Sequence, residues 1–274
     1  MHEGMESMKI RAVMAAILAT TAMMTSGFGA PAVTAAERKP TDGFSWYCKN
    51  NDEGRQPELP AEFSFIRENG GYYLNEKAED DNKVIYLTFD AGYENGNVEK
   101  ILDVLKKHNV PAAFFILGNL ITRNTDLVRR MVDEGHLVCN HTNRHHDMSR
   151  VKDQEAFQRE LESLVEIMRE TCGAEIAPFY RPPEGRFSEA NLAWANEMGY
   201  KTIFWSYAYA DWDNNKQMSE EKALNKLLTH THNGEVLLLH PTSATNAAIL
   251  DEYLTRLEEI GYSFGTLYEL TAKG

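Results

Sequence analysis

The stretch KVIYLTFDAG at residues 83–92 decides the fold of this chain. Residues 84–89 consist almost wholly of β-branched and aromatic side chains, a composition that predicts a buried strand. The strand runs directly into Asp90, and Gly92 follows two residues later. A carboxylate at the mouth of a buried strand costs free energy unless a partner neutralises it or a reaction uses it. Because parallel α/β folds place their chemistry at the carboxyl ends of strands, Asp90 is a candidate catalytic residue, with a turn or helix cap as the alternative.

Strand-like and helical segments alternate from residue 84 onward, which is typical of a mostly parallel sheet. Strands are predicted at residues 84–89, 112–117, 136–140, 178–181, 201–205, 235–239 and 262–265. Helices are predicted at residues 98–105, 127–134, 154–171, 189–198, 219–228 and 247–260, with Asn97 as the cap of the first. Gly135, Gly173, Gly199, Gly234 and Gly261 stand where helices should end. These steps predict an α/β fold of about seven strands with a closed or nearly closed, barrel-like sheet.

The composition indicates a globular chain with an ordinary core. The chain has 274 residues, of which 43% are hydrophobic and 25% are charged, and this length suits a single domain of barrel size. The net charge of -13 argues against a general binder of nucleic acid or of an anionic membrane. Cys48, Cys139 and Cys172 are too few and too scattered for a disulfide scaffold or a zinc knuckle, and no pairing follows from the sequence.

The first 36 residues have the layout of a secretory signal. Lys9 and Arg11 precede an apolar stretch at residues 12–24, and small residues follow at 30–36. The apolar stretch is short for a membrane-spanning helix, so we expect export, with an uncleaved N-terminal anchor or an amphipathic helix as alternatives. Residues 37–82 are polar with scattered aromatic side chains. They are predicted to form an extended lead-in that packs against the domain at residues 83–274.

Two histidines follow the strand predicted at residues 136–140. His141 and His145 are four residues apart, so one helical turn would place both imidazoles on the same side. That spacing suits two ligands of one divalent metal, for which imidazole favours zinc or a neighbouring transition ion. The pattern is common, and taken alone it is a weak sign of a metal site.

Three further polar residues follow predicted strands in the same way. Arg181 precedes two prolines that fix the backbone, and its guanidinium can hold a carboxylate. Asp211 lies in an aromatic-rich loop, and His240 ends an apolar strand. Each taken singly has an ordinary explanation: an exposed surface turn for Arg181, an ordinary core for the aromatic loop of Asp211, and a buried structural role for His240. Together with Asp90 and His141, however, they follow five different predicted strands, whose ends share one rim in a barrel. We therefore predict that they form one site.

The chain resembles the polysaccharide deacetylases, carbohydrate esterase family four, in five ordered motifs: TFDAG (88–92), HTNRH (141–145), RPPEG (181–185), DW (211–212) and LH (239–240). The resemblance covers residues 83–270. The stretches YLTFDAGYENGN (86–97), IFWSYAYADWDNNK (203–216), 237–248 and FSWY (44–47) are most similar to the bacterial branch that forms muramic delta-lactam. The resemblance implies a single catalytic domain with a distorted (β/α) barrel that removes acetyl groups from N-acetylated sugars.

The resemblance also implies a metal and a general base. A divalent metal, zinc with cobalt or manganese as alternatives, would bind His141 and His145. The metal would polarise the amide carbonyl and acidify a bound water. Asp90 would take the proton from that water as it attacks, and Arg181 would hold Asp90 ionised and oriented.

A general acid and a substrate pocket are implied in the same way. His240 would protonate the departing amine, which is a poor leaving group as an anion. Asp211 would orient His240 and favour its imidazolium form. The residues implied for the substrate pocket are Trp212, Leu239, Pro182 and Tyr93.

The sequence departs from the family pattern at two positions. Most members carry a second Asp directly after the base, where it binds the metal, but this chain has Ala91, which has no donor atom. Metal binding is therefore expected to be weak, with two protein ligands against the usual three of catalytic zinc. Glu184 replaces the usual aromatic residue after the prolines, and an acidic side chain there would not help to bind an anionic lactyl group.

The resemblance predicts an exported de-N-acetylase that acts on N-acetylmuramic acid in the glycan strand of peptidoglycan. The branch suggests a step toward muramic delta-lactam in the cell wall and an association with sporulation. The alternatives are a deacetylase of chitin-like or N-acetylglucosamine glycans and, because of Ala91, a non-catalytic glycan-binding derivative of the fold. We expect a monomer with no nucleic-acid partner, and contact with the membrane only through an uncleaved N-terminal anchor.

Overall fold

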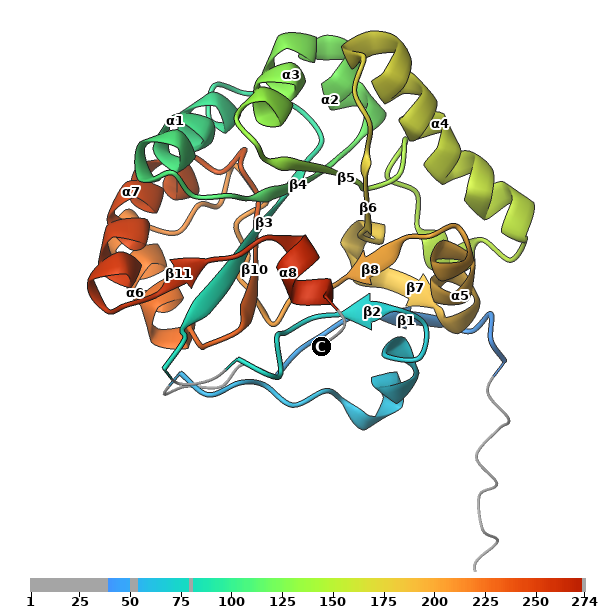
Figure 1. The fold of residues 1–274 in the computed structure, drawn as a ribbon, viewed down its shortest axis with the longest axis horizontal. Helices are drawn as coiled ribbons and strands as arrows, with labels where there is room; N and C mark the ends of the chain where they lie inside the picture. Colours follow the sequence, from blue (N-terminus) through green and yellow to red (C-terminus); the bar gives the residue numbers. More distant parts are fainter. Residues whose placement is uncertain (1–38, 50–53, 79–80, 273–274) are drawn as a thin grey trace, which may run out of the picture. The chain divides into compact units, whose positions relative to one another are not determined.

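The structure is a computed structural model that describes residues 39–49, 54–78 and 81–272 (Figure 1). All of these residues fall within one unit, Lys39–Gly274. The predicted secretory segment at residues 1–36 lies outside the described residues. Within the described residues, no helix combines the length and the apolar character needed to cross a membrane.

A nine-stranded sheet forms the centre of the unit, and every pairing in it is parallel. Its strands are β2 (Gly71–Tyr72), β3 (Val84–Ala91), β4 (Ala113–Ile116), β5 (Leu137–Asn140), β6 (Ala177–Tyr180), β8 (Lys201–Ile203), β9 (Tyr207–Ala208), β10 (Glu235–Leu239) and β11 (Ser263–Phe264). The order across the sheet is β2-β8-β6-β5-β4-β3-β10-β9, and β11 pairs with the start of β3. Within the described residues β2 and β9 are not paired with each other, so the curved sheet stays open as a half-barrel. The predicted distorted (β/α) barrel is confirmed.

The seven predicted strands are all present, and the strands that the sequence analysis missed are short. The latter are β2, β9 and the antiparallel pair β1 (Gly43–Ser45) and β7 (Arg186–Ser188), each of two or three residues. Segments of this length show too little periodicity to predict, because their pairing depends on partners far away in the chain.

Strand β3 is buried on both faces, as its unbroken run of large side chains predicted. Leu87 and Phe89 belong to a core cluster with the apolar faces of the helices that cover the outer side of the sheet. Tyr86 lies in a different cluster with side chains of the neighbouring strands. The hydroxyl of Thr88 donates to the carbonyl of Leu237 on β10 at 2.7 Å. The strand at the centre of the fold therefore fixes the position of the Asp90 carboxylate near its end.

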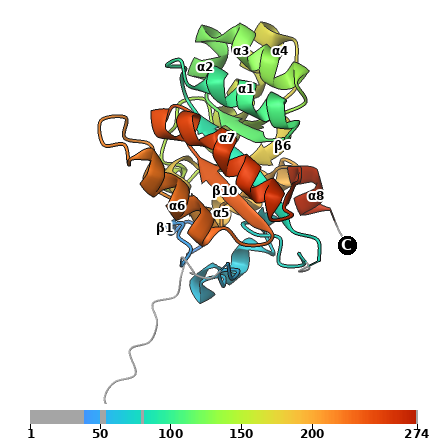
Figure 2. The same cartoon turned by 90° about the vertical axis from the view of Figure 1, so that its left-hand side faces the viewer.

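Helices cover the outer side of the sheet (Figures 1 and 2). The predicted ones are α1 (Val98–His108), α3 (Thr125–Asp133), α4 (Gln154–Cys172), α5 (Glu189–Glu197), α6 (Glu220–His230) and α7 (Ala244–Glu259). Two short helices, α2 (Gly118–Arg123) and α8 (Leu267–Thr271), were not predicted. Asn97 stands at the start of α1, but its side chain makes no capping bond and donates instead to the carbonyl of Thr242 at 3.1 Å.

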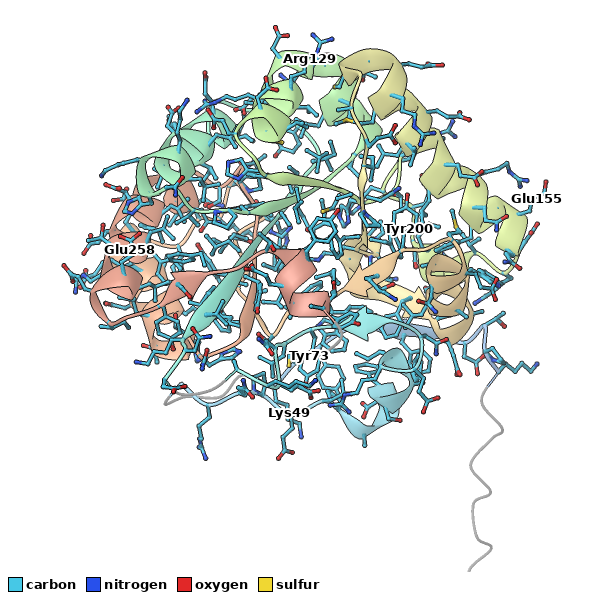
Figure 3. The ribbon with its side chains drawn as sticks, in the orientation of Figure 1. Lys49, Tyr73, Arg129, Glu155, Tyr200 and Glu258 are labelled. Atoms are coloured by element: carbon cyan, nitrogen blue, oxygen red, sulfur yellow. The ribbon has the colours of Figure 1, made fainter. Side chains whose placement is uncertain are left out.

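The described part of the lead-in packs on the sheet through an aromatic cluster. A 3-10 helix at Ala61–Ile66 contributes Phe63 and Phe65 to this cluster, and β2 extends the edge of the sheet beside β8. Trp46 stacks on Phe204 with ring centroids 4.4 Å apart, and its indole nitrogen donates to the carbonyl of Trp205 at 3.0 Å. Figure 3 shows the side chains of this region around Tyr73, which belongs to the same cluster.

Candidate active site

The carboxyl ends of β3, β5, β6 and β10 bring the predicted residues together. Asp90 is the second-last residue of β3. Its Oδ1 accepts a hydrogen bond from Nη1 of Arg181 at 2.9 Å. Its Oδ2 lies 3.6 Å from Nε2 of His141, the residue that follows β5. His240 follows β10 and lines the same cavity as Asp90 and His141. The predicted convergence of these residues on one rim is therefore found in the structure.

Arg181 is fully buried and held on three sides. Its Nε donates to the carbonyl of Ile203 at 2.9 Å, and its Nη2 donates to the carbonyl of Phe204 at 3.1 Å. The guanidinium carbon also lies 4.2 Å from the ring centroid of Phe115. Because the cation has no freedom to turn away, it fixes the orientation of the Asp90 carboxylate.

The pKa of Asp90 lies below its usual value. Burial by itself raises this pKa, but the positive charge of Arg181 and smaller contributions from His141 and His240 lower it by more. Asp90 is therefore ionised at neutral pH, as a general base must be.

The histidine pair lies in a loop, so the predicted helical turn is wrong. Residues 141–147 form no helix, and Thr142 and His145 both have left-handed backbones, with φ of 69° and 59°. The backbone N–H of Thr142 donates to the side chain of Asn140 at 2.9 Å, and that of His145 donates to the hydroxyl of Thr142 at 3.0 Å. These local bonds compete with a helix. The loop still brings the imidazoles of His141 and His145 together, with ring centroids 5.1 Å apart.

His141 is oriented with one ring nitrogen toward the cavity. Its Nδ1 donates to the carbonyl of Arg181 at 2.8 Å, which leaves Nε2 as the unprotonated nitrogen that faces Asp90. Burial lowers the pKa of His141 to about 4, so the ring is neutral at physiological pH. A neutral imidazole held through its other nitrogen is the arrangement that metal-binding histidines adopt.

The residues present do not complete a three-ligand metal site. Ala91 is buried beside Asp90 and lines the cavity, but it offers only a methyl group. Among the described residues, no group of three His, Cys, Asp or Glu side chains is placed to hold a metal ion. Catalytic zinc normally has three protein ligands. His141 and His145 supply two, and the donor set therefore does not fit a standard catalytic zinc site.

His240 and Asp211 form a tight pair on the other side of the cavity. Nδ1 of His240 lies 2.7 Å from Oδ1 of Asp211, and the backbone N–H of His240 donates to Oδ2 at 2.8 Å. Burial lowers the pKa of His240, but the hydrogen bond and the charge of Asp211 raise it by more, so that it lies above its usual value. The imidazolium form that a general acid needs is therefore favoured.

Two residues that support this pair were not predicted. Nδ2 of Asn246 donates to Oδ2 of Asp211 at 2.6 Å, and Asn246 in turn accepts a short hydrogen bond from the hydroxyl of Tyr209. Asn246 is buried in the first turn of α7, on a face that is otherwise apolar. A polar residue in that position was the only signal in the sequence that could have pointed to it.

The cavity between these groups has a volume of about 700 Å³. Tyr93 and Trp212 line it, as predicted, but Pro182 and Leu239 do not. Successive residues of a strand face opposite sides. Leu239 therefore points into the core beneath the helices, and its neighbour Leu238 lines the cavity instead. Pro182 is buried, and Glu184 and Gly185 of the same turn line the cavity in its place.

Trp212 lies at the mouth of the cavity rather than in its wall, because 61% of its surface is exposed. Its ring packs edge-to-face near His240, with centroids 6.1 Å apart. The hydroxyl of Tyr93 accepts a hydrogen bond from Nδ2 of Asn214 at 2.7 Å, and this bond joins the loops that carry the two aromatic side chains. The mouth therefore presents aromatic surface of the kind that sugar rings can stack on.

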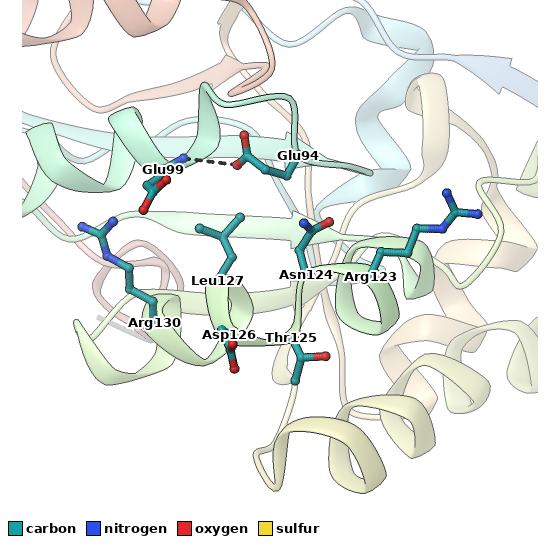
Figure 4. Close-up of a pocket in the computed structure, with 8 residues that line it drawn as sticks. All are labelled: Glu94, Glu99, Arg123, Asn124, Thr125, Asp126, Leu127 and Arg130. Carbon is teal, nitrogen blue, oxygen red and sulfur yellow. Dashed lines mark hydrogen bonds between the residues drawn. The ribbon is translucent and has the colours of Figure 1, made fainter.

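A second cavity, of about 570 Å³, lies on the surface between the start of α1 and the helices α2 and α3 (Figure 4). It is lined by Glu94, Glu99, Arg123, Asn124, Thr125, Asp126, Leu127 and Arg130. The carboxylate of Glu94 accepts from the backbone N–H of Glu99 at 3.2 Å and so serves the start of α1. This cavity shares no lining residue with the first and contains none of the predicted catalytic residues.

Comparison with known proteins identifies the family. The family model described as polysaccharide deacetylase matches residues 77–203. The peptidoglycan-N-acetylmuramic acid deacetylase PdaA of Bacillus subtilis is 38% identical to this chain over 86% of the chain and 88% of that protein. The chain belongs to the polysaccharide deacetylases. As a member of carbohydrate esterase family 4, it is a hydrolase that acts on amide bonds.

Solved structures support the same assignment. The structure of Bacillus subtilis PdaA, a family 4 carbohydrate esterase, superimposes with a TM-score of 0.80 at 37% identity, covering 85% of this chain and 98% of that one. A family 4 pseudoenzyme from Bacillus anthracis gives a TM-score of 0.66 at 25% identity, covering 74% of this chain and 69% of that one. Deacetylases of this family generally depend on a metal, which makes the alanine at residue 91 the main departure of this chain.

Proposed function

We propose that this chain removes the acetyl group from N-acetylmuramic acid residues of peptidoglycan. The observation that carries the proposal is the placement of two differently tuned groups on one cavity. Asp90 is held ionised by Arg181, and His240 is held toward its imidazolium form by Asp211. Such a pair suits amide hydrolysis, which needs a base for water and an acid for the amine. The choice of muramic acid is supported by the similarity to the Bacillus subtilis enzyme over most of both chains.

The reaction follows from the two pairs. Asp90 takes a proton from a water molecule as the water oxygen attacks the carbonyl carbon of the acetyl group. His240 then gives its proton to the sugar nitrogen as the carbon–nitrogen bond breaks, which yields acetate and a free amine. Arg181 and Asp211 act as positioning residues, since they hold the base and the acid but do not reach the reacting atoms.

We also propose that a divalent cation binds weakly to His141 and His145, zinc with cobalt or manganese as alternatives. The orientation of His141, whose Nε2 faces the cavity, supports this proposal. The methyl group of Ala91 in the place of a third ligand is the reason to expect weak binding. No step described above depends on this cation.

The setting of the reaction is proposed from the sequence. The charged, apolar and small-residue layout of residues 1–36 supports export, with the protein free in the cell wall or held by an uncleaved N-terminal anchor. The partner is the glycan strand, and the free amine made on muramic acid could then close onto the lactyl group as a delta-lactam, a modification that would link the enzyme to sporulation. We propose that the protein acts as a monomer.

Two other functions are alternatives to the proposed deacetylation of muramic acid, and the same experiment tests them. A deacetylase of chitin-like or N-acetylglucosamine glycans would use the same catalytic pairs. A non-catalytic glycan-binding protein is favoured by one observation, the alanine at residue 91.

The test compares substrates. The full chain is incubated with peptide-stripped peptidoglycan and with chitooligosaccharides, and mass spectrometry locates the lost acetyl group. Loss of acetyl from muramic residues is the expected result. Loss only from glucosamine residues would replace the proposed substrate, and glycan binding without any loss would indicate the non-catalytic protein.

A further inference from the structure

The turn after Arg181 places a charged side chain on the wall of the active cavity. Glu184 and Gly185 both line the cavity, and both have left-handed backbones, with φ of 56° and 63°. This conformation costs a residue other than glycine about 1–2 kcal/mol. Gly185 has a steric reason to be glycine, because an added Cβ would lie 2.8 Å from the ring of Trp205. Glu184 is thus a carboxylate held at the cavity by a backbone that glycine would adopt at lower cost.

The charges around Glu184 are arranged in a short chain of ion pairs. Oε2 of Glu184 lies 2.9 Å from Nε of Arg186, and Nη1 of Arg186 lies 3.0 Å from Oδ2 of Asp147. Two carboxylates therefore share one guanidinium, and the group as a whole carries an excess negative charge. The side chains of Glu184 and Arg186 are 56% and 47% exposed, so both are accessible to a ligand that binds in the cavity.

The cationic group that lines the cavity is His240, which is already paired with Asp211. Of the described residues that line it, none is lysine or arginine. Arg181 lies beneath the cavity, and its guanidinium is taken by Asp90 and two backbone carbonyls. A carboxylate bound beside Glu184 would therefore meet no lysine or arginine among the described residues of the cavity lining.

We propose that Glu184 sets the charge preference of the site, so that the cavity favours a muramic residue whose lactyl group is an amide over one whose lactyl group is a free carboxylate. The inference rests on the proposed function, since it concerns the side group that distinguishes muramic acid from glucosamine. An amide-linked lactyl group carries no charge and suffers no repulsion from Glu184. A free lactyl carboxylate does, and Arg186 offsets the repulsion only in part because Asp147 shares it.

The test uses one glycan in two charge states. Peptide-stripped peptidoglycan carries free lactyl carboxylates, and coupling with ammonia converts them to amides without changing the sugars. The quantity compared is kcat/KM for acetate release from the amide form divided by that from the acid form. We expect a ratio above one for the wild type at low ionic strength. Because the charges involved are half exposed, Glu184→Gln should lower the ratio by about two- to fivefold.

Two further variants make the test specific. Arg186→Gln removes the cation that offsets Glu184 and should raise the ratio. Glu170→Gln removes the same charge from an exposed position on α4 and should leave the ratio as in the wild type. Added salt should bring the wild-type ratio toward one, because it screens exposed charges.

The outcomes separate this inference from the proposed function. A wild type that prefers the acid form, or a ratio unchanged in Glu184→Gln, would overturn the inference while leaving the deacetylase intact. If the wild type released acetate from neither form, the proposed function itself would fail. Circular dichroism of each variant before the assay confirms that a changed ratio comes from folded protein.

Discussion

The replacement Ala91→Asp should convert the two-histidine site into a three-ligand metal site. Ala91 ends β3, is buried, and lines the cavity together with His141 and His145. A carboxylate there would add the third oxygen or nitrogen donor that catalytic zinc normally has. In the absence of metal, the same carboxylate would lie beside Asp90 and destabilise the fold through like-charge repulsion and burial.

The expected gain in zinc affinity is large. Loss of a partner that merely supports a metal ligand costs about 10- to 100-fold in affinity, and a direct ligand should contribute no less. We therefore expect Ala91→Asp to bind zinc at least about 100-fold more tightly than the wild type, which corresponds to about 2.7 kcal/mol. At a free zinc concentration 100 times the dissociation constant of the variant, zinc should stabilise the variant by the same amount. For a domain of this size, that raises the melting temperature by about 5–10 °C.

The assay is isothermal titration of metal-depleted protein with zinc, followed by thermal melting with and without zinc. Ala91→Asn is the matched control, since it has the same shape without the charge and should fall between the wild type and Ala91→Asp. Adding His145→Ala to Ala91→Asp should remove most of the gain. A wild type that already binds zinc as tightly as Ala91→Asp would refute the reasoning, because it would mean that the site is complete without a third side chain at residue 91.

Three other predictions concern the general acid His240, the buried carboxyl group of Glu235 and the aromatic side chain of Trp212 at the mouth of the cavity. Asp211→Asn should move the alkaline loss of activity to lower pH, because the acid must be protonated and Asp211 raises the pKa of His240; a pH profile of kcat with an unchanged alkaline limb would contradict this. Burial raises the pKa of Glu235 to about 8, so the folded state holds a proton that the unfolded state loses above its ordinary pKa of about 4.5. Stability should therefore fall as pH rises from about 4.5 to 8, and urea unfolding of Glu235→Gln should show a flatter dependence than the wild type. Trp212→Ala should raise KM by about two- to tenfold with a smaller change in kcat, since the exposed ring can stack on a sugar but does not hold the acid; a fall in kcat alone would contradict this position.

The sequence predicted the parts of the fold that depend on local pattern. Strand β3 is an unbroken run of large apolar side chains, and such a run is recognisable without knowledge of its neighbours. Once the parallel sheet was inferred, the position of Asp90, Arg181 and His240 at one rim followed from topology. This is why the catalytic pairs could be proposed before their contacts were known.

The predictions that proved wrong concern details that residue spacing alone does not fix. The loop that carries His141 and His145 has the spacing of a helical turn, but hydrogen bonds to nearby polar side chains hold it in another conformation. Leu239 was assigned to the pocket in place of Leu238, an error of one residue that places the side chain on the opposite face of the strand. Asn246 was missed because its partner, Asp211, lies 35 residues away in the chain.

The most direct test of the catalytic assignment is acetate release from peptide-stripped peptidoglycan by the full chain and by Asp90→Asn. Each protein is assayed after metal depletion and again with zinc, cobalt or manganese added. The assignment predicts release by the wild type and a loss of at least about 100-fold in Asp90→Asn, because that variant keeps the shape of the base but cannot take a proton. Equal release by the two proteins, or none by the folded wild type under any of these conditions, would contradict it.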